Sequence, residues 1–247
     1  MLGLPDGVKA CLFDLDGVLT QTAKVHAAAW KAMFDEFLRA WAARHGQEFV
    51  PFDAVKDYDE YVDGKPRYEG VQSFIASRGI ELPQGTTADP PEAETIDGLG
   101  NRKNELVLKM IRERGVQPYE GSVRYVHAAK EAGLRCAVVS SSTNTHDVLR
   151  AAGIDDLFDQ IIDGVVAERE HLKGKPAPDT YLAGARVVGV EPREAAVFED
   201  ALAGVEAGRA GSFGIVVGVD RVGQADALRA HGADVVVKDL AKLLDAS

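Results

Sequence analysis

Short runs of apolar and β-branched residues alternate along most of the chain with segments that have the apolar spacing of a helix. This alternation is typical of an α/β fold with a mainly parallel sheet. The predicted strands are VKACLF, LRCAVVS, AAVFED, GIVVGV and ADVVV. The predicted helices lie at 122–132, 144–152, 178–188, 201–210 and 223–231, and several of them end at a glycine, a common helix stop.

Residues 21–117 interrupt this alternation, because they contain no strand pattern of the core type. They begin with a predicted helix that ends at Gly46 and finish with another, NRKNELVLKMIRERG, that stops at Gly115. The first of these helices has an apolar stripe formed by Trp30, Met33, Phe34, Phe37, Leu38 and Trp41. A stretch at 84–99, rich in Pro, Gly and Thr, is interpreted as a surface excursion. We expect a core domain at 1–20 and 118–247 and an inserted, mostly helical domain at 21–117.

Composition and charge argue against two classes of function, nucleic-acid binding and binding to anionic membranes. The chain has 247 residues, 46% of them apolar, and its 28 Lys and Arg against 39 Asp and Glu give a net charge of −11. This balance argues against binding to nucleic acid or to an anionic membrane. Since the sequence shows neither a signal peptide nor an apolar run of roughly 20 residues, we expect a cytoplasmic protein that does not bind membranes. Cys11 and Cys136 lie in apolar stretches and are expected to be buried thiols.

Polar side chains follow three of the predicted strands, where ligands bind in open α/β sheets. These side chains are Asp14 and Asp16, Ser140, Ser141 and Ser142, and Glu199 and Asp200. A further polar group, Lys175 in KGKPAPD, precedes a predicted helix that begins with Pro and Asp. These groups are the candidates for a catalytic site.

Three carboxylates at one sheet edge would repel one another unless a cation offset their charge. Because oxygen ligands favour hard cations, the acids at Asp14, Asp16 and Asp200 predict a Mg²⁺ site. A carboxylate there, with a lysine and a hydroxyl nearby, can attack phosphorus, and Asp14 is the natural nucleophile. Asp16 is placed to act as general acid and then as general base. Gly17 permits the tight turn that brings the two aspartates to one place.

Each of these residues alone has a simpler interpretation. A carboxylate after a strand usually caps a helix, a serine there is usually a turn residue, and a single loop lysine is usually solvated. A calcium loop is excluded, because Val18 stands where an oxygen ligand belongs and Val25 where the closing Glu belongs. A catalytic site is favoured because polar groups follow three different predicted strands at the same end.

The segments FDLDGVLT, Ser140, KGKPAPD and FEDALAG resemble, in order, the four motifs of the haloacid dehalogenase superfamily. The resemblance implies a Rossmann-like parallel sheet core, with 21–117 as a helical cap that closes over the site. It also implies an aspartyl phosphate on Asp14 and acid–base catalysis by Asp16. The implied metal ligands are Asp14, the backbone carbonyl of Asp16, Glu199 and Asp200, and the implied phosphate ligands are Ser140, Ser141 and Lys175.

Within this superfamily the chain is similar to the β-phosphoglucomutase subfamily, which interconverts two glucose monophosphates through a bisphosphate. The resemblance rests on TAKVHAAAW, GKPR, RKN and SSSTN. The substrate-binding residues that it implies are Thr22, His26, Trp30, Gly64, Lys65, Arg67, Lys103, Asn104, Ser142 and Asn144. By default, His26 and Trp30 would be ordinary helix residues and Lys65 and Arg67 solvated charges in a Gly and Pro turn.

The sequence departs from this pattern at two places. Thr143 occupies a position where the compared mutases carry a lysine, and the excursion at 84–99 is additional. We expect Lys65 to compensate for the missing lysine. A phosphatase acting on sugar phosphates through the same aspartate, and a sensor without catalysis, stay open as alternatives. A hexose phosphate is the expected partner, and the protein is expected to be a monomer.

Overall fold

The computed structural model describes residues 2–244, which divide into two compact units. The core unit comprises Met1–Gln21 and Val116–Ser247, and the inserted unit comprises Thr22–Gly115. The chain leaves and re-enters the core unit through neighbouring segments. Gln21 N donates to Gln117 O at 2.8 Å, and Thr20 and Pro118 form an antiparallel bridge.

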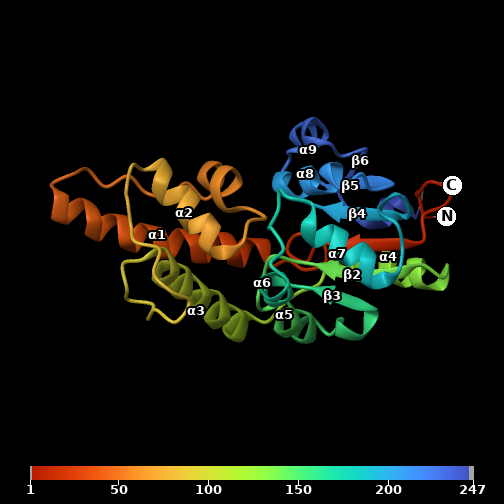
Figure 1. The fold of residues 1–247 in the computed structure, drawn as a ribbon, viewed down its shortest axis with the longest axis horizontal. Helices are drawn as coiled ribbons and strands as arrows, with labels where there is room; N and C mark the ends of the chain where they lie inside the picture. Colours follow the sequence, from red (N-terminus) through yellow and green to blue (C-terminus); the bar gives the residue numbers. More distant parts are fainter. Residues whose placement is uncertain (1, 245–247) are drawn as a thin grey trace. The chain divides into compact units, whose positions relative to one another are not determined.

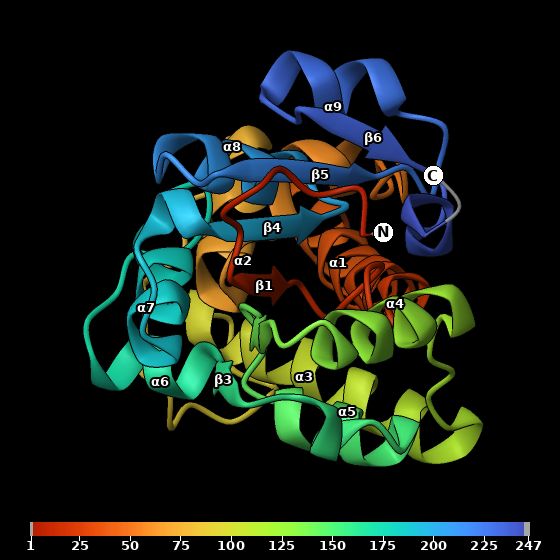
Figure 2. The same cartoon turned by 90° about the vertical axis from the view of Figure 1, so that its right-hand side faces the viewer.

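Within the described residues, the core unit contains one six-stranded sheet in which all neighbouring strands are parallel (Figure 2). Its order is β3-β2-β1-β4-β5-β6. The strands are β1 (Ala10–Phe13), β2 (Arg135–Val139), β3 (Gln160–Ile162), β4 (Ala195–Glu199), β5 (Ile215–Val219) and β6 (Val235–Val237). Because β1 lies between β2 and β4, the polar residues that follow these three strands emerge at one edge of the sheet.

Successive residues of each strand face opposite sides of the sheet, and both sides are covered by helices. Leu12 faces α7 (Asp179–Val188), whose Gly184 lies against it. Phe13 points the other way and packs edge-on against Tyr125 of α4 (Glu120–Glu131), with 6.3 Å between ring centroids. Figure 2 shows α7 and α4 on opposite sides of the sheet. The remaining helices of this unit are α5 (Thr145–Ala152), α6 (Gly164–Arg169), α8 (Leu202–Ala210) and α9 (Ala225–His231).

The predicted α/β class and parallel sheet are confirmed, with the five predicted strands and the five predicted core helices. Cys11 and Cys136 are buried free thiols, as predicted. The structure places them opposite each other on β1 and β2. The sequence analysis missed β3 and α6. β3 has three residues at the edge of the sheet, and such a short apolar run has no readable period.

The inserted unit packs three helices and one π-helical turn around its own core. α1 (Ala23–His45) and α3 (Ile96–Arg114) lie side by side, and α2 (Arg67–Ser77) follows the turn at Tyr58–Val62 (Figure 1). The predicted stripe of α1 faces this core, where Phe34 stacks on Trp30 and contacts the rings of Phe52 and Phe74. Burial of these large apolar side chains stabilises the unit.

Two expectations for the inserted unit were wrong. Residues 67–77 form α2, a helix that was not predicted, and Val71, Phe74 and Ile75 supply its buried face. α3 begins at Ile96, inside the stretch interpreted as an excursion, because the Thr95 side chain caps it and Ile96 and Leu99 are buried. The excursion therefore shortens to residues 84–95, which we call the proline-rich segment.

Among the described residues, no helix is both long enough and apolar enough to cross a membrane.

Candidate functional site

A buried lysine joins the ends of three strands in the core unit. Lys175 lies in the loop between α6 and α7 and is 1% exposed. Its Nζ donates to Asp14 Oδ1 at 2.6 Å, to Glu199 Oε1 at 2.5 Å and to the carbonyl of Val139 at 3.3 Å. The three protons of one ammonium group therefore connect residues at the ends of β1, β2 and β4.

Glu199 is the most deeply buried acid of this cluster, with no exposed surface. Its Oε1 also accepts a hydrogen bond from the hydroxyl of Tyr181 at 3.2 Å, and its Oε2 accepts one from the backbone N–H of Ala201 at 2.9 Å. A buried carboxylate requires such partners, because water is absent to solvate it. Glu199 is thus held in one orientation.

Burial and neighbouring charge set the protonation of Asp14 and Lys175. Burial raises the pKa of Asp14 well above its ordinary value; Lys175 acts against this, while Glu199 and Asp16 add to it. Burial alone would lower the pKa of Lys175, but the carboxylates of Asp14 and Glu199 raise it above the ordinary value. Lys175 is therefore a fixed cation, and further positive charge beside Asp14 would favour the carboxylate form of that side chain.

Asp200 lies against the turn that follows β1, close to Asp14. Gly17 has a φ of +87° and lies so close to Asp200 that an added β-carbon would be 1.7 Å from Asp200 Oδ2. The carbonyl of Gly17 accepts a hydrogen bond from Arg221 Nε at 2.7 Å, and the carbonyl of Asp200 accepts one from Gln224 at 3.0 Å. Glycine is required here for both its conformation and its lack of a side chain.

Asp14, Glu199 and Asp200 each offer a carboxylate oxygen, and these three oxygens lie within 4.8 Å of one another. Three hard oxygen donors in this space suit a divalent cation such as Mg²⁺ or Ca²⁺. The close fit of Gly17 against Asp200 also leaves the carboxylate little freedom to turn away. The cluster could therefore hold a metal ion. Asp16 lies in the same turn, half-buried and bridged to Thr20.

The loop after β2 is ordered by its own side chains. Ser140 is 2% exposed, and its hydroxyl accepts a hydrogen bond from the N–H of Ser142 at 3.1 Å. The hydroxyl of Ser142 accepts one in turn from the N–H of Asn144 at 3.1 Å. Hydroxyl groups and backbone N–H groups in such a loop can hold a phosphate. Thr143 lies against Gly164 at the start of α6.

In the inserted unit, three predicted residues from two helices come together. Lys103 of α3 donates to Nδ1 of His26 on α1 at 2.9 Å, and its Nζ lies 4.7 Å from the ring centroid of Trp30. Lys103 and Trp30 are 6% and 3% exposed, so the cation is held against the aromatic ring largely away from water. Thr22, which is buried, immediately precedes α1.

Lys65 and Arg67 are not held as a pair. Lys65 Nζ donates to Ser73 Oγ at 3.1 Å, and burial lowers its pKa. Arg67 is the first residue of α2, where a turn position was expected, and its Nη2 donates to the hydroxyl of Tyr68 at 3.0 Å. Gly64, with a φ of +70°, forms the preceding turn.

The sequence analysis missed several residues that support the site. Tyr181 had the appearance of a core helix residue, and nothing in its spacing signals that its hydroxyl meets Glu199. Arg221 and Gln224 follow β5, a strand end at which no candidate was named. That position could have been found, because β5 is parallel to β4 and ends at the same edge of the sheet.

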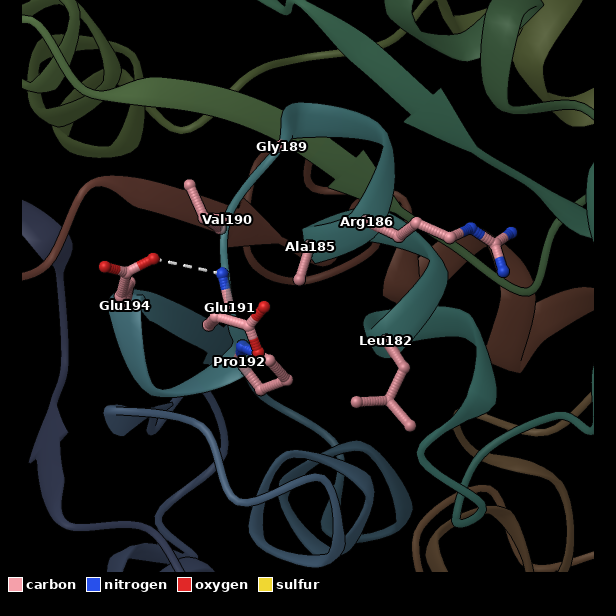
Figure 3. Close-up of a pocket in the computed structure, with 8 residues that line it drawn as sticks. All are labelled: Leu182, Ala185, Arg186, Gly189, Val190, Glu191, Pro192 and Glu194. Atoms are coloured by element: carbon pink, nitrogen blue, oxygen red, sulfur yellow. Dashed lines mark hydrogen bonds between the residues drawn. The ribbon is translucent and has the colours of Figure 1, made fainter.

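A surface pocket lies near the C-terminal end of α7 and the turn before β4 (Figure 3). Glu191 N–H donates to Glu194 Oε2 beside it at 3.1 Å. This turn precedes β4, whereas the carboxylate cluster follows it, so the pocket belongs to the opposite edge of the sheet.

The haloacid dehalogenase-like hydrolase family matches residues 8–211. A protein named Beta-phosphoglucomutase from Mycobacterium bovis is 58% identical over 99% of this chain and 94% of its own length. A protein of the same name from Bacillus subtilis is 31% identical over 96% of this chain and 92% of its own length.

Solved structures agree with these matches. The crystal structure of a beta-phosphoglucomutase from Clostridium difficile is 26% identical, with a TM-score of 0.72 over 96% of this chain and 93% of the other. The family match covers the strand ends that carry Asp14, Ser140 and Glu199, and the loop that carries Lys175. The chain belongs to the haloacid dehalogenase-like hydrolase family.

Proposed function

We propose that this protein interconverts β-D-glucose 1-phosphate and glucose 6-phosphate with Mg²⁺, through an aspartyl phosphate on Asp14 and a glucose 1,6-bisphosphate intermediate. The observation that carries the proposal is the buried contact of Lys175 with Asp14 and Glu199, beside Asp200. The substrate is supported by the full-length relative named Beta-phosphoglucomutase, at 58% identity.

Asp14 is the proposed nucleophile. With its phosphoryl group in place, the 6-hydroxyl of β-glucose 1-phosphate attacks phosphorus, and the bond to Asp14 breaks as Asp16 takes the hydroxyl proton. The resulting bisphosphate then presents its 1-phosphate to Asp14. The carboxylate attacks that phosphorus, and Asp16 returns the proton to the departing sugar oxygen. Glucose 6-phosphate leaves, and phospho-Asp14 is regenerated.

Positive charge and N–H donors hold the transferring phosphoryl group in this proposal. Lys175 supplies the fixed cation, and Ser140 and Ser141 supply hydrogen bonds from the loop after β2. The second phosphate is assigned to Ser142, Asn144, Arg67 and Lys65. The sugar contacts are assigned to Thr22, His26, Trp30, Gly64, Lys103 and Asn104.

Mg²⁺ is the proposed cofactor, held by Asp14, the backbone carbonyl of Asp16, Glu199 and Asp200. The ion would supply positive charge where the pKa of Asp14 is raised by burial, and so favour its ionised form. Oxygen donors alone make up the cluster, which fits a hard cation.

The deciding experiment follows glucose 6-phosphate and free phosphate together. The protein is incubated with β-glucose 1-phosphate, Mg²⁺ and a trace of glucose 1,6-bisphosphate. The proposal expects glucose 6-phosphate to accumulate with little free phosphate, and to require the added metal. A control lacking the bisphosphate is expected to show a lag, since phospho-Asp14 must first form.

A phosphatase acting on sugar phosphates is the second candidate, because the matching family is described as a hydrolase. It would use the same aspartate, with water in place of the sugar hydroxyl. Free phosphate formed in step with loss of β-glucose 1-phosphate would support it and contradict the mutase. A cytoplasmic location and a monomeric state stay predictions.

A further inference from the structure

Asn101 is one of several side chains that join the proline-rich segment, residues 84–95, to α3. Asn101, in the second turn of α3, donates from Nδ2 to the carbonyl of Asp89 at 2.8 Å and to the carbonyl of Thr87 at 3.2 Å. Both hydrogens of its amide group are therefore used by backbone of the segment. The amide oxygen of Asn101 is turned to the opposite side.

That oxygen accepts a hydrogen bond from the hydroxyl of Tyr68 on α2 at 2.8 Å. The same hydroxyl accepts one from Arg67 Nη2 at 3.0 Å. Because a guanidinium has no acceptor, the Tyr68 oxygen must accept from Arg67, and its single proton must go to Asn101. All the donors thus point one way, from Arg67 through Tyr68 and Asn101 to the proline-rich segment.

The ring of Tyr68 is fixed by contact as well as by these hydrogen bonds. A β-carbon added at Gly100 of α3 would lie 2.6 Å from Tyr68 Cδ1, so only glycine lets the ring approach the helix this closely. The guanidinium carbon of Arg67 lies 4.8 Å from the centroid of the same ring. Tyr68 therefore holds Arg67 both by its face and by its hydroxyl.

Arginine has a long side chain that loses rotamer freedom when it binds a ligand. A side chain already held before binding loses less, which improves affinity without a new contact to the ligand. Only Nη2 of Arg67 bonds to Tyr68, and the buried Nε has no hydrogen-bond partner among the described residues. The chain of donors therefore orients the guanidinium without using up its N–H groups.

We propose that Tyr68 and Asn101 are positioning residues that hold Arg67 for the second phosphate of the substrate, and that the proline-rich segment anchors them. This inference rests on the proposed function, in which Arg67 binds that phosphate. It gives a role to the part of the chain that is additional to the mutase pattern.

The test compares Tyr68→Phe and Asn101→Ala with the unmodified protein and with Arg67→Ala in the mutase assay. Each positioning variant is expected to raise KM for β-glucose 1-phosphate about tenfold, the loss typical of one hydrogen bond, with a smaller change in kcat. The double variant Arg67→Ala with Tyr68→Phe is expected to match Arg67→Ala alone, because Tyr68 acts through Arg67.

Two controls separate positioning from general damage to the fold. Hydrolysis of p-nitrophenyl phosphate, which has no second phosphate, is expected to be unchanged in Tyr68→Phe and Asn101→Ala. Glu94, in the proline-rich segment, forms an ion pair with Arg44, with 2.6 Å between Oε1 and Nη1. Glu94→Gln removes this ion pair and leaves Asn101 intact. It is expected to keep the KM of the unmodified protein.

The outcomes distinguish the two proposals. If the unmodified protein forms no glucose 6-phosphate, the proposed function fails. If it does, and Arg67→Ala is impaired while Tyr68→Phe and Asn101→Ala keep the original KM, the positioning role alone is overturned. The positioning role is also overturned if Tyr68→Phe raises KM as much in the Arg67→Ala background as it does in the unmodified protein. It is overturned as well if Arg67→Ala has the KM of the unmodified protein.

Discussion

The ammonium group of Lys175 lies 2.6 Å from Asp14 Oδ1, with the lysine 1% and the aspartate 8% exposed. The two residues are 161 positions apart in the chain, so this contact fixes the loop before α7 to the end of β1. Water does not compete strongly for either charge, and the pair therefore acts at low effective dielectric.

Replacing Asp14 by Asn is expected to abolish turnover, with a loss of at least about 1,000-fold, because an amide oxygen is a poor nucleophile toward phosphorus. The measurement is formation of glucose 6-phosphate at saturating substrate and Mg²⁺. Asp226→Asn, at a fully exposed carboxylate on α9, is the control and is expected to keep full activity. Substantial turnover by Asp14→Asn would contradict the role of Asp14.

Lys175→Met is expected to lower the free energy of unfolding by about 3–5 kcal/mol, since it leaves the carboxylates of Asp14 and Glu199 buried without their cation. Urea unfolding measures this loss, and added Mg²⁺ is expected to recover part of it. The matched control is Lys9→Met, which removes a largely exposed ion pair with Glu194 and is expected to cost far less, because solvent screens the two charges. Equal losses in the two variants would argue against a buried charge cluster.

Gly17→Ala is expected to weaken Mg²⁺ binding about tenfold or more, because the new β-carbon would push Asp200 out of the cluster. Gly7→Ala is the control, since Gly7 has a similar φ of +92° with nothing within 4 Å of the added atom. Both variants have the same backbone strain, of about 1–2 kcal/mol, but only the first has the clash. Titration calorimetry with Mg²⁺ should separate them, and unchanged affinity in Gly17→Ala would remove Asp200 from the metal site.

Tyr181→Phe keeps the buried ring and removes the hydroxyl that donates to Glu199. We expect Mg²⁺ affinity to fall about tenfold, as for other groups that orient a metal ligand. Tyr125→Phe is the control: it also loses a hydroxyl, which donates to the carbonyl of Leu2 at 2.8 Å. Both variants should lose about 1 kcal/mol of stability, and only Tyr181→Phe should lose metal affinity. A shared loss of affinity would mean that the effect is structural.

Lys65→Ala is expected to raise KM for β-glucose 1-phosphate about tenfold, if Lys65 takes the place of the lysine missing at Thr143. Lys56→Ala, at an exposed lysine of the same unit, is the control. Thr143→Lys added to Lys65→Ala is expected to restore part of the loss. An unchanged KM in Lys65→Ala would contradict the hypothesis that Lys65 replaces the lysine missing at position 143.

The core unit could be predicted from the sequence because its strands are buried on both faces and end in polar residues. The apolar runs that end at Asp14 and Glu199 each predict a buried strand with a polar group at its carboxyl end. Because β1 and β4 pair in parallel, these two strand ends lie side by side. Tyr181 could not be found in this way, since its contact with Glu199 depends on how α7 packs across the sheet rather than on any local pattern.

The inserted unit was harder to predict for a physical reason. Gly98 and Gly100 signal a loop, yet both lie inside α3, where close packing requires them: Gly98 against Ala93 and Gly100 against Tyr68. Tertiary contacts thus overrode the low helix propensity of glycine. Arg67 begins α2, whose buried face is formed by Val71, Phe74 and Ile75, and GKPR alone does not reveal this position.

The backbone hydrogen bond between Gln21 and Gln117 holds the two connections to the inserted unit side by side. Any segment whose own ends lie close together could replace residues 22–115 without stretching the chain on either side. In the proposed function the sugar contacts lie in the inserted unit, so replacing that unit is expected to change substrate preference while Asp14 and Asp16 stay in place.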